Sequence, residues 1–249
     1  MTATKDNQFT VNVCLFDLDG TIVSTTVAAE AAWRKLCAEH NVDPEELFKI
    51  SHGSRTSEML AKFFPKIDNT DNKGVIALEK SMAEDYLDTV TLIKNAPELL
   101  KQLDVNPETG DKWEDRKWAI VTSGSPVLAF SWFKSILKDV GKPDVFITSF
   151  DVSQGKPHPE GYSRARDLLC EKWHYNKSDA KSVVFEDAPV GIQAGKAMGA
   201  TTIGITSSYD KEVLFEAGAD FVVKDLSQVK IIENNKNHVT FEVIDPIRR

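Results

Sequence analysis

One stretch decides the fold of this chain: Val11-Asn12-Val13-Cys14-Leu15-Phe16-Asp17-Leu18-Asp19-Gly20-Thr21, in which an apolar run leads directly into two aspartates. A short apolar run that ends in turn residues predicts a buried strand. In open α/β sheets, ligands bind at the carboxyl ends of the strands, so Asp17 and Asp19 are expected to face a crevice. Paired carboxylates at such a place favour phosphoryl transfer. The alternative is a solvated acidic turn.

Further short apolar runs follow along the chain, and most of them lead into a segment with helix periodicity. They occupy residues 118–121, 145–147, 183–185, 201–205 and 221–223. Strands that alternate with helices predict an α/β fold with a parallel, doubly wound sheet. Near the end of the chain, residues 231–232 and 239–243 flank a turn-rich tetrapeptide and predict a hairpin, which we expect to extend this sheet antiparallel at an edge.

The long interval between the first two strands carries helix patterns and no convincing strand. Asp43-Pro44-Glu45-Glu46 has the cap, the first-turn proline and the acid of a helix start. Apolar stripes at helical spacing run through residues 29–40, 59–64 and 75–86. Their methionine and aromatic positions are typical of a core and not of a cofactor site. We therefore expect an inserted all-helical domain at 25–95, with 1–24 and 96–249 forming the main domain.

Composition and charge exclude several classes of protein. The chain has 38 acidic and 30 basic residues, a formal net charge of −8, which opposes binding to nucleic acid or to an anionic membrane. The densest basic cluster, Lys112 to Lys117, alternates with acids and is expected to be a solvated surface loop. Apolar patches cannot be located from the pattern, and we expect a monomer.

Cysteines and the N-terminal residues bear on the compartment. The three cysteines are widely spaced, which favours neither a disulfide framework nor a zinc site. Residues 1–8 are polar, and no apolar run has the length of a membrane span. We expect a cytoplasmic protein that needs no membrane partner.

Two further strand ends supply groups that can hold a phosphate. Thr122-Ser123-Gly124 follows the strand at 118–121 and precedes a helix start, so that a hydroxyl and free backbone N–H groups meet at a helix N-terminus. Lys156 stands between turn residues, where its ammonium can offset the charge of a phosphate. Taken alone, the first could be an ordinary capped junction and the second a surface lysine.

The strand at 183–185 ends in two more acids, Glu186 and Asp187. With Asp17 and Asp19 they make four carboxylates, and such a group repels itself unless a divalent cation or protons neutralise it. Ligation by oxygen alone suits Mg²⁺ better than zinc or copper. The alternative is that Glu186 and Asp187 only cap the following helix.

The motifs DLDGT, TSG, GKP and FEDAPVGI, in this order and spacing, resemble the four signature motifs of the haloacid dehalogenase-like phosphohydrolases. The resemblance spans nearly the whole chain. Longer strings such as SHGSRT and EGYSRARDLL look like the yeast 2-deoxyglucose-6-phosphate phosphatases, with glycerol-phosphate phosphatases as near relatives. This resemblance implies a Rossmann-like core with a helical cap, and Mg²⁺-dependent hydrolysis of a small sugar or polyol phosphate.

The resemblance also implies roles for single residues. Asp17 would attack phosphorus and form an aspartyl-phosphate, while Asp19 would protonate the leaving alkoxide and then activate water. The metal would be held by the Asp17 carboxylate, the Asp19 carbonyl and Asp187, with Glu186 nearby or ligating through water. The phosphate oxygens would be held by Thr122, the following amides from Ser123 onward, and Lys156.

The loop from Ser51 to Thr56 matches the substrate-facing loop of that family, where Arg55 and then His52 are the expected substrate contacts. Without the resemblance, it would be a helix-starting turn with a solvated arginine. The related β-phosphoglucomutases have a histidine where this chain has Ala29, which argues against a mutase, and Asp19 argues against a dehalogenase. Glycerol phosphate as the substrate, or a phosphometabolite-binding protein without turnover, are the remaining alternatives.

Overall fold

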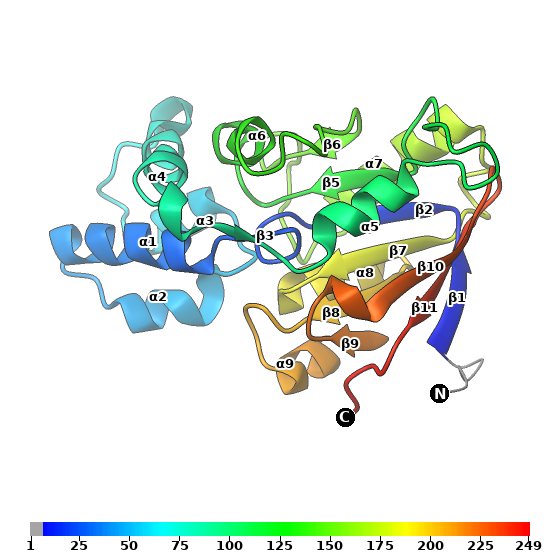
Figure 1. Ribbon diagram of the computed structural model, residues 1–249. Helices are drawn as coiled ribbons and strands as arrows, with labels where there is room; N and C mark the ends of the chain where they lie inside the picture. The colour runs from blue at the N-terminus through cyan, green and yellow to red at the C-terminus, as the bar shows by residue number, and fades with distance from the viewer. Residues whose placement is uncertain (1–6) are drawn as a thin grey trace.

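A six-stranded parallel sheet forms the centre of the computed structural model, which describes residues 7–249 (Figure 1). The strand order is β6-β5-β2-β7-β8-β9. The strands are β2 (Val13–Phe16), β5 (Trp118–Val121), β6 (Phe146–Ile147), β7 (Ser182–Glu186), β8 (Thr201–Ile205) and β9 (Phe221–Val223). The predicted parallel, doubly wound sheet is confirmed. The expectation for residues 1–8 falls mostly on residues 1–6, which lie outside the described residues.

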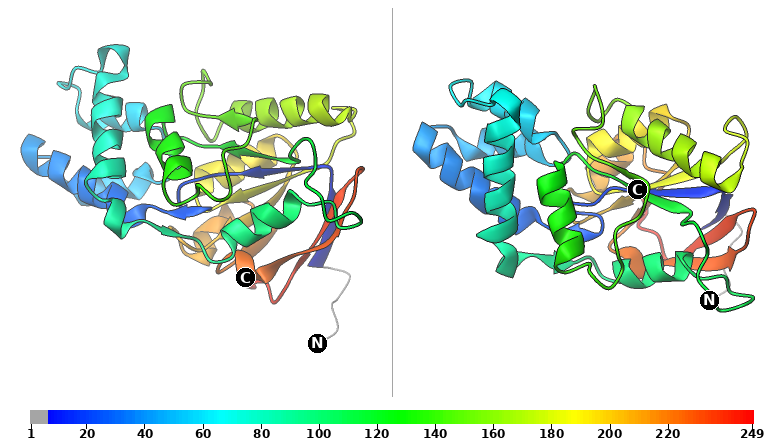
Figure 2. Two further views of the ribbon diagram at one scale, coloured as in Figure 1. Left: turned by 45° about the horizontal axis from the view of Figure 1, so that its top comes forward. Right: turned by 90° about the horizontal axis from the view of Figure 1, so that it is seen from above.

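Both faces of the sheet are covered, as the view from above in Figure 2 shows. Val13 and Leu15 of β2 pack toward α7 (Glu160–Trp173) and α8 (Pro189–Ala197), whereas Cys14 and Phe16 point to the opposite face. Near that face lie α5 (Ala96–Leu103) and α6 (Pro126–Lys134), while α9 (Lys211–Glu216) packs on β8 and β9. A strand buried on both faces reads as a continuous apolar run, which explains the pattern from which β2 was predicted.

The predicted C-terminal hairpin forms, but its expected position at the edge of the parallel sheet is wrong. β10 (Val229–Asn234) and β11 (Val239–Val243) join β1 (Gln8–Val11) in a separate antiparallel sheet of order β1-β11-β10. Val239, Phe241 and Val243 are buried, and the Phe241 ring lies 5.8 Å from that of Phe185 in β7. The hairpin thus covers a face of the parallel sheet, because the apolar side of the hairpin is buried by packing against that face.

The first apolar run is also divided, at Asn12, into β1 and β2. The Asn12 amide donates to the Asn237 carbonyl, and its side-chain oxygen accepts from the Lys181 backbone N–H. This side chain holds the bend between the two sheets. In the sequence, the only sign of this bend is a polar residue, Asn12, inside an apolar run.

Four helices lie between the short strands β3 (Val23–Ser24) and β4 (Thr91–Leu92), which pair antiparallel where no convincing strand was expected. We call them the helical insert. Its helices are α1 (Thr26–His40), α2 (Pro44–Ser51), α3 (Thr56–Phe63) and α4 (Lys73–Glu84). The Asp43 side chain caps α2 by accepting from the Glu45 N–H at 2.9 Å, as its sequence predicts. In Figures 1 and 2 the insert lies beyond the carboxyl ends of the sheet strands.

The basic segment before β5 differs from the expected solvated loop. Lys112 is exposed, but the Lys117 side chain is fully buried. Its ammonium lies 4.8 Å from the centre of the Trp113 ring and 4.6 Å from that of Trp173, and it donates to the Asn235 carbonyl. Aromatic faces and a carbonyl replace the water that an alternating charge pattern predicts.

All three cysteines are buried and free. Among residues 7–249, none of the helices combines the length and the apolar character that crossing a membrane requires.

Candidate active site

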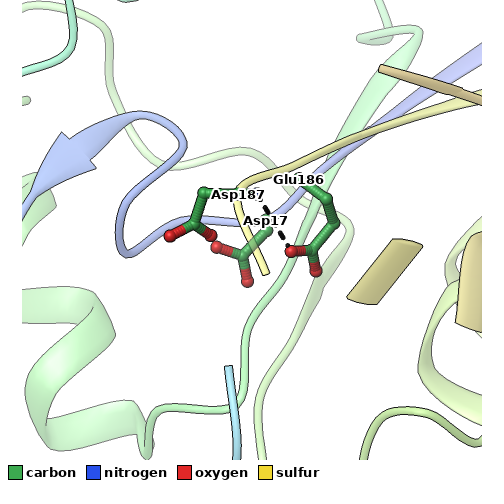
Figure 3. Close-up of side chains that lie close together, drawn as sticks. All are labelled: Asp17, Glu186 and Asp187. Carbon is green, nitrogen blue, oxygen red and sulfur yellow. Dashed lines mark hydrogen bonds between the residues drawn. The ribbon is translucent and has the colours of Figure 1, made fainter. Parts of the chain in front are cut away.

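Three carboxylates from two neighbouring strands meet at the carboxyl edge of the sheet (Figure 3). Asp17 follows β2, Glu186 ends β7 and Asp187 follows it, and each offers an oxygen within 4.8 Å of the others. β2 and β7 pair in parallel register, with Phe16 opposite Phe185, so their ends coincide. The side chains of Asp17, Glu186 and Asp187 are almost fully buried.

Gly20 makes the close approach of Asp187 possible. Its φ is +93°, and a Cβ at this position would lie 1.9 Å from Asp187 Oδ2. Only glycine meets both the left-handed backbone and the contact without strain. The Thr21 hydroxyl donates to Asp187 Oδ1 at 3.5 Å and so ties the turn after Asp19 to this carboxylate.

Lys156 brings the positive charge of the site. Its Nζ lies 2.5 Å from Asp17 Oδ1 and 2.6 Å from Glu186 Oε1, and only 6% of its side chain is exposed. Burial opposes the charge of this ammonium, but the two carboxylates outweigh it and raise the pKa of Lys156 above its usual value. The lysine therefore stays protonated beside the carboxylate that it contacts.

Glu186 acts mainly as the support of Lys156. Its Oε1 accepts from Lys156 and from the Tyr162 hydroxyl, both at 2.6 Å, and its Oε2 accepts from the Asp187 and Ala188 N–H groups at 3.2 and 3.1 Å. A Cβ on Gly191 would lie 1.7 Å from Glu186 Oε1, so the glycine leaves the space that this side chain fills.

The Asp19 carboxylate turns away from the three acids. Its Oδ1 accepts from Trp132 Nε1 at 2.9 Å and its Oδ2 accepts from the Thr122 hydroxyl at 3.2 Å. Burial raises the pKa of Asp19, while these hydrogen bonds oppose the rise. Thr122 Oγ1 also accepts from the Gly124 N–H at 2.9 Å, so the turn after β5 is tied directly to Asp19. The Ser123 hydroxyl donates to the Gly53 carbonyl of the insert at 2.7 Å.

The acids form a site that suits a hard cation. Burial, followed by the charges of Glu186 and Asp187, raises the pKa of Asp17 in spite of Lys156, and burial and Glu186 raise that of Asp187 to about 7. One lysine does not neutralise three buried carboxylates. The donor set of Asp17, Glu186 and Asp187 consists only of oxygen, which fits Mg²⁺.

A cavity of about 90 Å³ lies between the acids and the helical insert. Asp17, Asp19 and Asp187 line the sheet side. The opposite side combines apolar and polar groups of the insert: Ala28, Ala29, Trp33, Met59 and Met82, with Ser51, His52, Thr56 and Glu79. The predicted substrate contact His52 therefore faces the cavity. Its Nε2 lies 3.4 Å from Glu30 Oε1, and burial lowers the pKa of its imidazole although Glu30 opposes this.

Arg55, the other predicted substrate contact, does not line this cavity. Its guanidinium pairs with Glu58 at 2.6 Å and reaches the carbonyls of Val152 and Ser153 at 3.5 and 3.4 Å. It lines a smaller cavity with Thr122 and Ser123, which follow β5, and with Lys156 and other residues of the loop after β6. Arg55 thus approaches Thr122, Ser123 and Lys156, the residues expected to bind phosphate, from the smaller cavity and not from the larger one.

Tyr162, Trp132 and Glu79 were not identified as site residues from the sequence. Each sits in a helix whose pattern indicates only a buried face, and hydrogen bonds from distant elements reveal its place. The segment EGYSRARDLL, which contains Tyr162, follows the GKP motif directly and was the nearest available signal.

Comparison with known proteins gives consistent matches. The family model for haloacid dehalogenase-like hydrolases matches residues 11–199. The chain is 68% identical to 2-deoxyglucose-6-phosphate phosphatase 2 of Saccharomyces cerevisiae, over 97% of this chain and 99% of that protein. It is 39% identical to glycerol-1-phosphate phosphohydrolase 1 of the same yeast, over 97% and 93% of the two chains.

Among solved structures, a HAD hydrolase of family IA, variant 3, from Entamoeba histolytica superimposes with a TM-score of 0.68 at 22% identity, covering 88% of this chain and 96% of that chain. At this level of sequence identity, the structural similarity shows a shared fold only.

Proposed function

The chain belongs to the haloacid dehalogenase-like hydrolase family, and from this premise we propose that it is a Mg²⁺-dependent phosphatase of small sugar or polyol phosphates, of the 2-deoxyglucose 6-phosphate type. The observation that carries the proposal is the placement of Asp17 beside Lys156 and Asp187, with Asp19 facing the same cavity. This arrangement combines a nucleophile, positive charge and a proton donor.

The reaction proceeds in two displacements. A carboxylate oxygen of Asp17 attacks phosphorus, the bond to the sugar oxygen breaks, and Asp19 gives its proton to the leaving alkoxide. Asp19 then takes a proton from water, whose oxygen attacks the aspartyl-phosphate. Inorganic phosphate leaves, and both aspartates return to their first state. Trp132 holds the Asp19 carboxylate during the proton transfers.

The remaining residues of the site bind the negative charge of the phosphate or the positive charge of the cation. Lys156, the Thr122 hydroxyl and the amides that follow it, including that of Ser123, hold the oxygens of the transferred group. Asp17, Asp187 and the Asp19 carbonyl would hold Mg²⁺, with Glu186 supporting the site through Lys156. The cation supplies positive charge that offsets the repulsion between the Asp17 carboxylate and a phosphate.

We propose residues 1–24 and 96–249 as the catalytic core and 25–95 as its cap. The position of the helical insert between the paired strands β3 and β4 supports this division. The two parts are in contact: the Ser123 hydroxyl donates to the Gly53 carbonyl, and Glu79 accepts from the Ser125 N–H at 2.8 Å. Closure of the cap would exclude bulk water from the first displacement. His52 contacts the part of the substrate beyond the phosphate, and Arg55 acts from the phosphate side.

Glycerol phosphate is the second candidate substrate, since the chain is also related to a phosphohydrolase of that name. Ala29, which lines the cavity, offers no proton for a mutase reaction. We also propose that the protein works as a monomer in the cytoplasm, without nucleic acid or membrane partners. Its three free cysteines and its net charge of −8 support this.

The test is release of inorganic phosphate from a panel of 2-deoxyglucose 6-phosphate, glycerol phosphates, sorbitol 6-phosphate and fructose 1-phosphate, with Mg²⁺ and with EDTA. We expect release with Mg²⁺, strongest for a sugar or polyol phosphate, and loss with EDTA. No release from any substrate with Mg²⁺ would favour a binding protein. Rearranged sugar phosphate without free phosphate would indicate a mutase, and release that EDTA leaves intact would contradict the role of the metal.

A further inference from the structure

Glu79 is a fully buried acid on the insert side of the cavity, and the catalytic scheme does not use it. It extends from α4, and its Oε1 accepts from the Thr56 hydroxyl at 2.6 Å while its Oε2 accepts from the Ser125 N–H at 2.8 Å. Within residues 7–249 it forms no ion pair. A buried carboxylate without a cation is costly, so its presence needs a reason.

Ser51 supplies an independent observation in the same cavity. Its hydroxyl oxygen is buried and has no hydrogen-bond partner among the described residues. Ser51 ends α2 and lines the cavity together with Glu79. Buried hydroxyl groups are nearly always paired, so an orphan on a residue that lines a cavity favours a partner that a ligand supplies.

The two groups complement each other chemically. Each oxygen of a carboxylate accepts more than one hydrogen bond, so Glu79 keeps acceptor capacity beyond Thr56 and Ser125. Burial raises the pKa of Glu79, while those two hydrogen bonds oppose the rise and favour the ionised form. The nearby cavity walls of Trp33, Met59 and Met82 are largely apolar. The hydroxyl groups of a ligand are donors that this acceptor capacity fits.

The charges that line the cavity oppose the binding of ligands that carry a second anionic group. Its lining contains Asp17, Asp19, Asp187 and Glu79, and among the described residues that line it there is no lysine or arginine. Lys156, the cation of the site, already contacts Asp17 and Glu186. A substrate with a carboxylate or second phosphate away from the reacting group would bring that charge toward Glu79, where low polarity strengthens repulsion.

We propose that Glu79 and Ser51 form a hydroxyl-recognition subsite that selects phosphate monoesters with neutral, hydroxylated bodies and rejects monoesters that carry a second anion. This inference rests on the proposed phosphatase function and adds the substrate feature that the insert recognises. Glu79 accepts from substrate hydroxyls and excludes anions by its charge, and Ser51 donates to or accepts from a hydroxyl.

The experiment compares two substrates that differ by a hydroxymethyl against a carboxylate, glycerol 3-phosphate and 3-phosphoglycerate. Glu79→Gln removes the charge and keeps the shape. Glu84→Gln makes the same change on an exposed position of the same helix and is the matched control. Values of kcat and KM are measured for both substrates with Mg²⁺, and thermal unfolding confirms that each variant is folded.

We expect the wild type to prefer glycerol 3-phosphate, and Glu79→Gln to reduce this preference in kcat/KM by roughly tenfold or more, mostly through KM. Glu84→Gln should retain the wild-type ratio. An unchanged ratio in folded Glu79→Gln would overturn the proposal. Absence of phosphate release by the wild type from the whole panel would overturn the proposed function instead, so the two failures are distinguishable.

Ser51→Ala is the second variant, and it keeps the proposal testable if Glu79→Gln does not fold. Removing an unpaired hydroxyl is expected to leave the stability nearly unchanged and to raise KM for glycerol 3-phosphate by roughly three- to tenfold. An unchanged KM would overturn the role of Ser51 and with it the subsite.

Discussion

Two buried lysines lie at opposite ends of the parallel sheet and have opposite electrostatic surroundings. Lys156, at the carboxyl ends of the strands, contacts Asp17 and Glu186, and its pKa is raised. Lys117 precedes β5 at the amino end of the sheet, forms no ion pair within the described residues, and burial lowers its pKa to about 8 although Cys14 opposes the change.

The comparison shows that burial alone does not make a lysine functional. Lys156 lines the smaller cavity and contacts Asp17, which lines the larger one, so its charge lies beside the space that a ligand would enter. Lys117 is enclosed by the rings of Trp113 and Trp173 and by the Asn235 carbonyl, so its charge serves only the local packing. We therefore expect changes at the carboxyl edge to affect turnover and changes at the amino edge to affect stability alone.

The largest effect is expected for Asp17→Asn. The amide keeps the shape of the carboxylate but cannot form the phosphoryl bond, so turnover should fall by about 1000-fold or more while the protein stays folded. Phosphate release and thermal unfolding measure the two parts. Retained steady-state activity would contradict the assignment of Asp17 as the nucleophile.

Lys156→Met should follow, with a decrease in kcat/KM of roughly 100- to 1000-fold on every substrate, because one preorganised positive donor to the phosphate is lost. The exposed Lys196→Met serves as the control with the same change. If Lys156→Met altered only the unfolding temperature, the contrast between the two ends of the sheet would fail.

Arg55→Ala is expected to have a smaller effect that depends on the substrate. It should change the ratio of kcat/KM values among sugar and polyol phosphates by up to about tenfold, and affect a small aryl phosphate less. A substrate panel measures this. An equal loss on all substrates would place Arg55 with Thr122 and Lys156, whose smaller cavity it shares.

Lys117→Met should leave turnover unchanged and alter the pH dependence of stability. The native lysine loses its proton above about pH 8 and the unfolded one only above about 10.4, so the unfolded chain binds more protons in between and wild-type stability rises with pH there. Between pH 7.5 and 10 the wild type should gain about 2 kcal/mol relative to Lys117→Met.

Urea unfolding at the two pH values measures this difference, with the exposed Lys112→Met as the control from the same segment. A wild type that gains nothing over Lys117→Met across this range would show that the ammonium is as well solvated as an ordinary surface lysine.

Much of the fold was predictable because buried parallel strands are continuous apolar runs. The strands at 118–121 and 201–205 are examples, with the bounds expected. The antiparallel partner of the hairpin was not predictable in the same way. β1 and β2 form one apolar run, and only the contacts of Asn12 show where it bends.

The site divides in the same manner. Asp17, Asp19, Lys156 and Asp187 stand at strand ends or in turns, where a polar residue interrupts an apolar pattern and is visible. Trp132 and Glu79 lie within amphipathic helices, where a polar group that faces a cavity looks like one that faces solvent. Their roles depend on hydrogen bonds to residues far along the chain.

The amino-acid order by itself determined the alternating strands and helices and the placement of acids after β2 and β7, because local periodicity and turn chemistry act over a few residues. Only the tertiary structure decided that Glu186 supports Lys156, that Arg55 shares a smaller cavity with Lys156, and that Lys117 is enclosed by aromatic rings. These outcomes depend on distances between segments far apart in sequence, which no local pattern encodes.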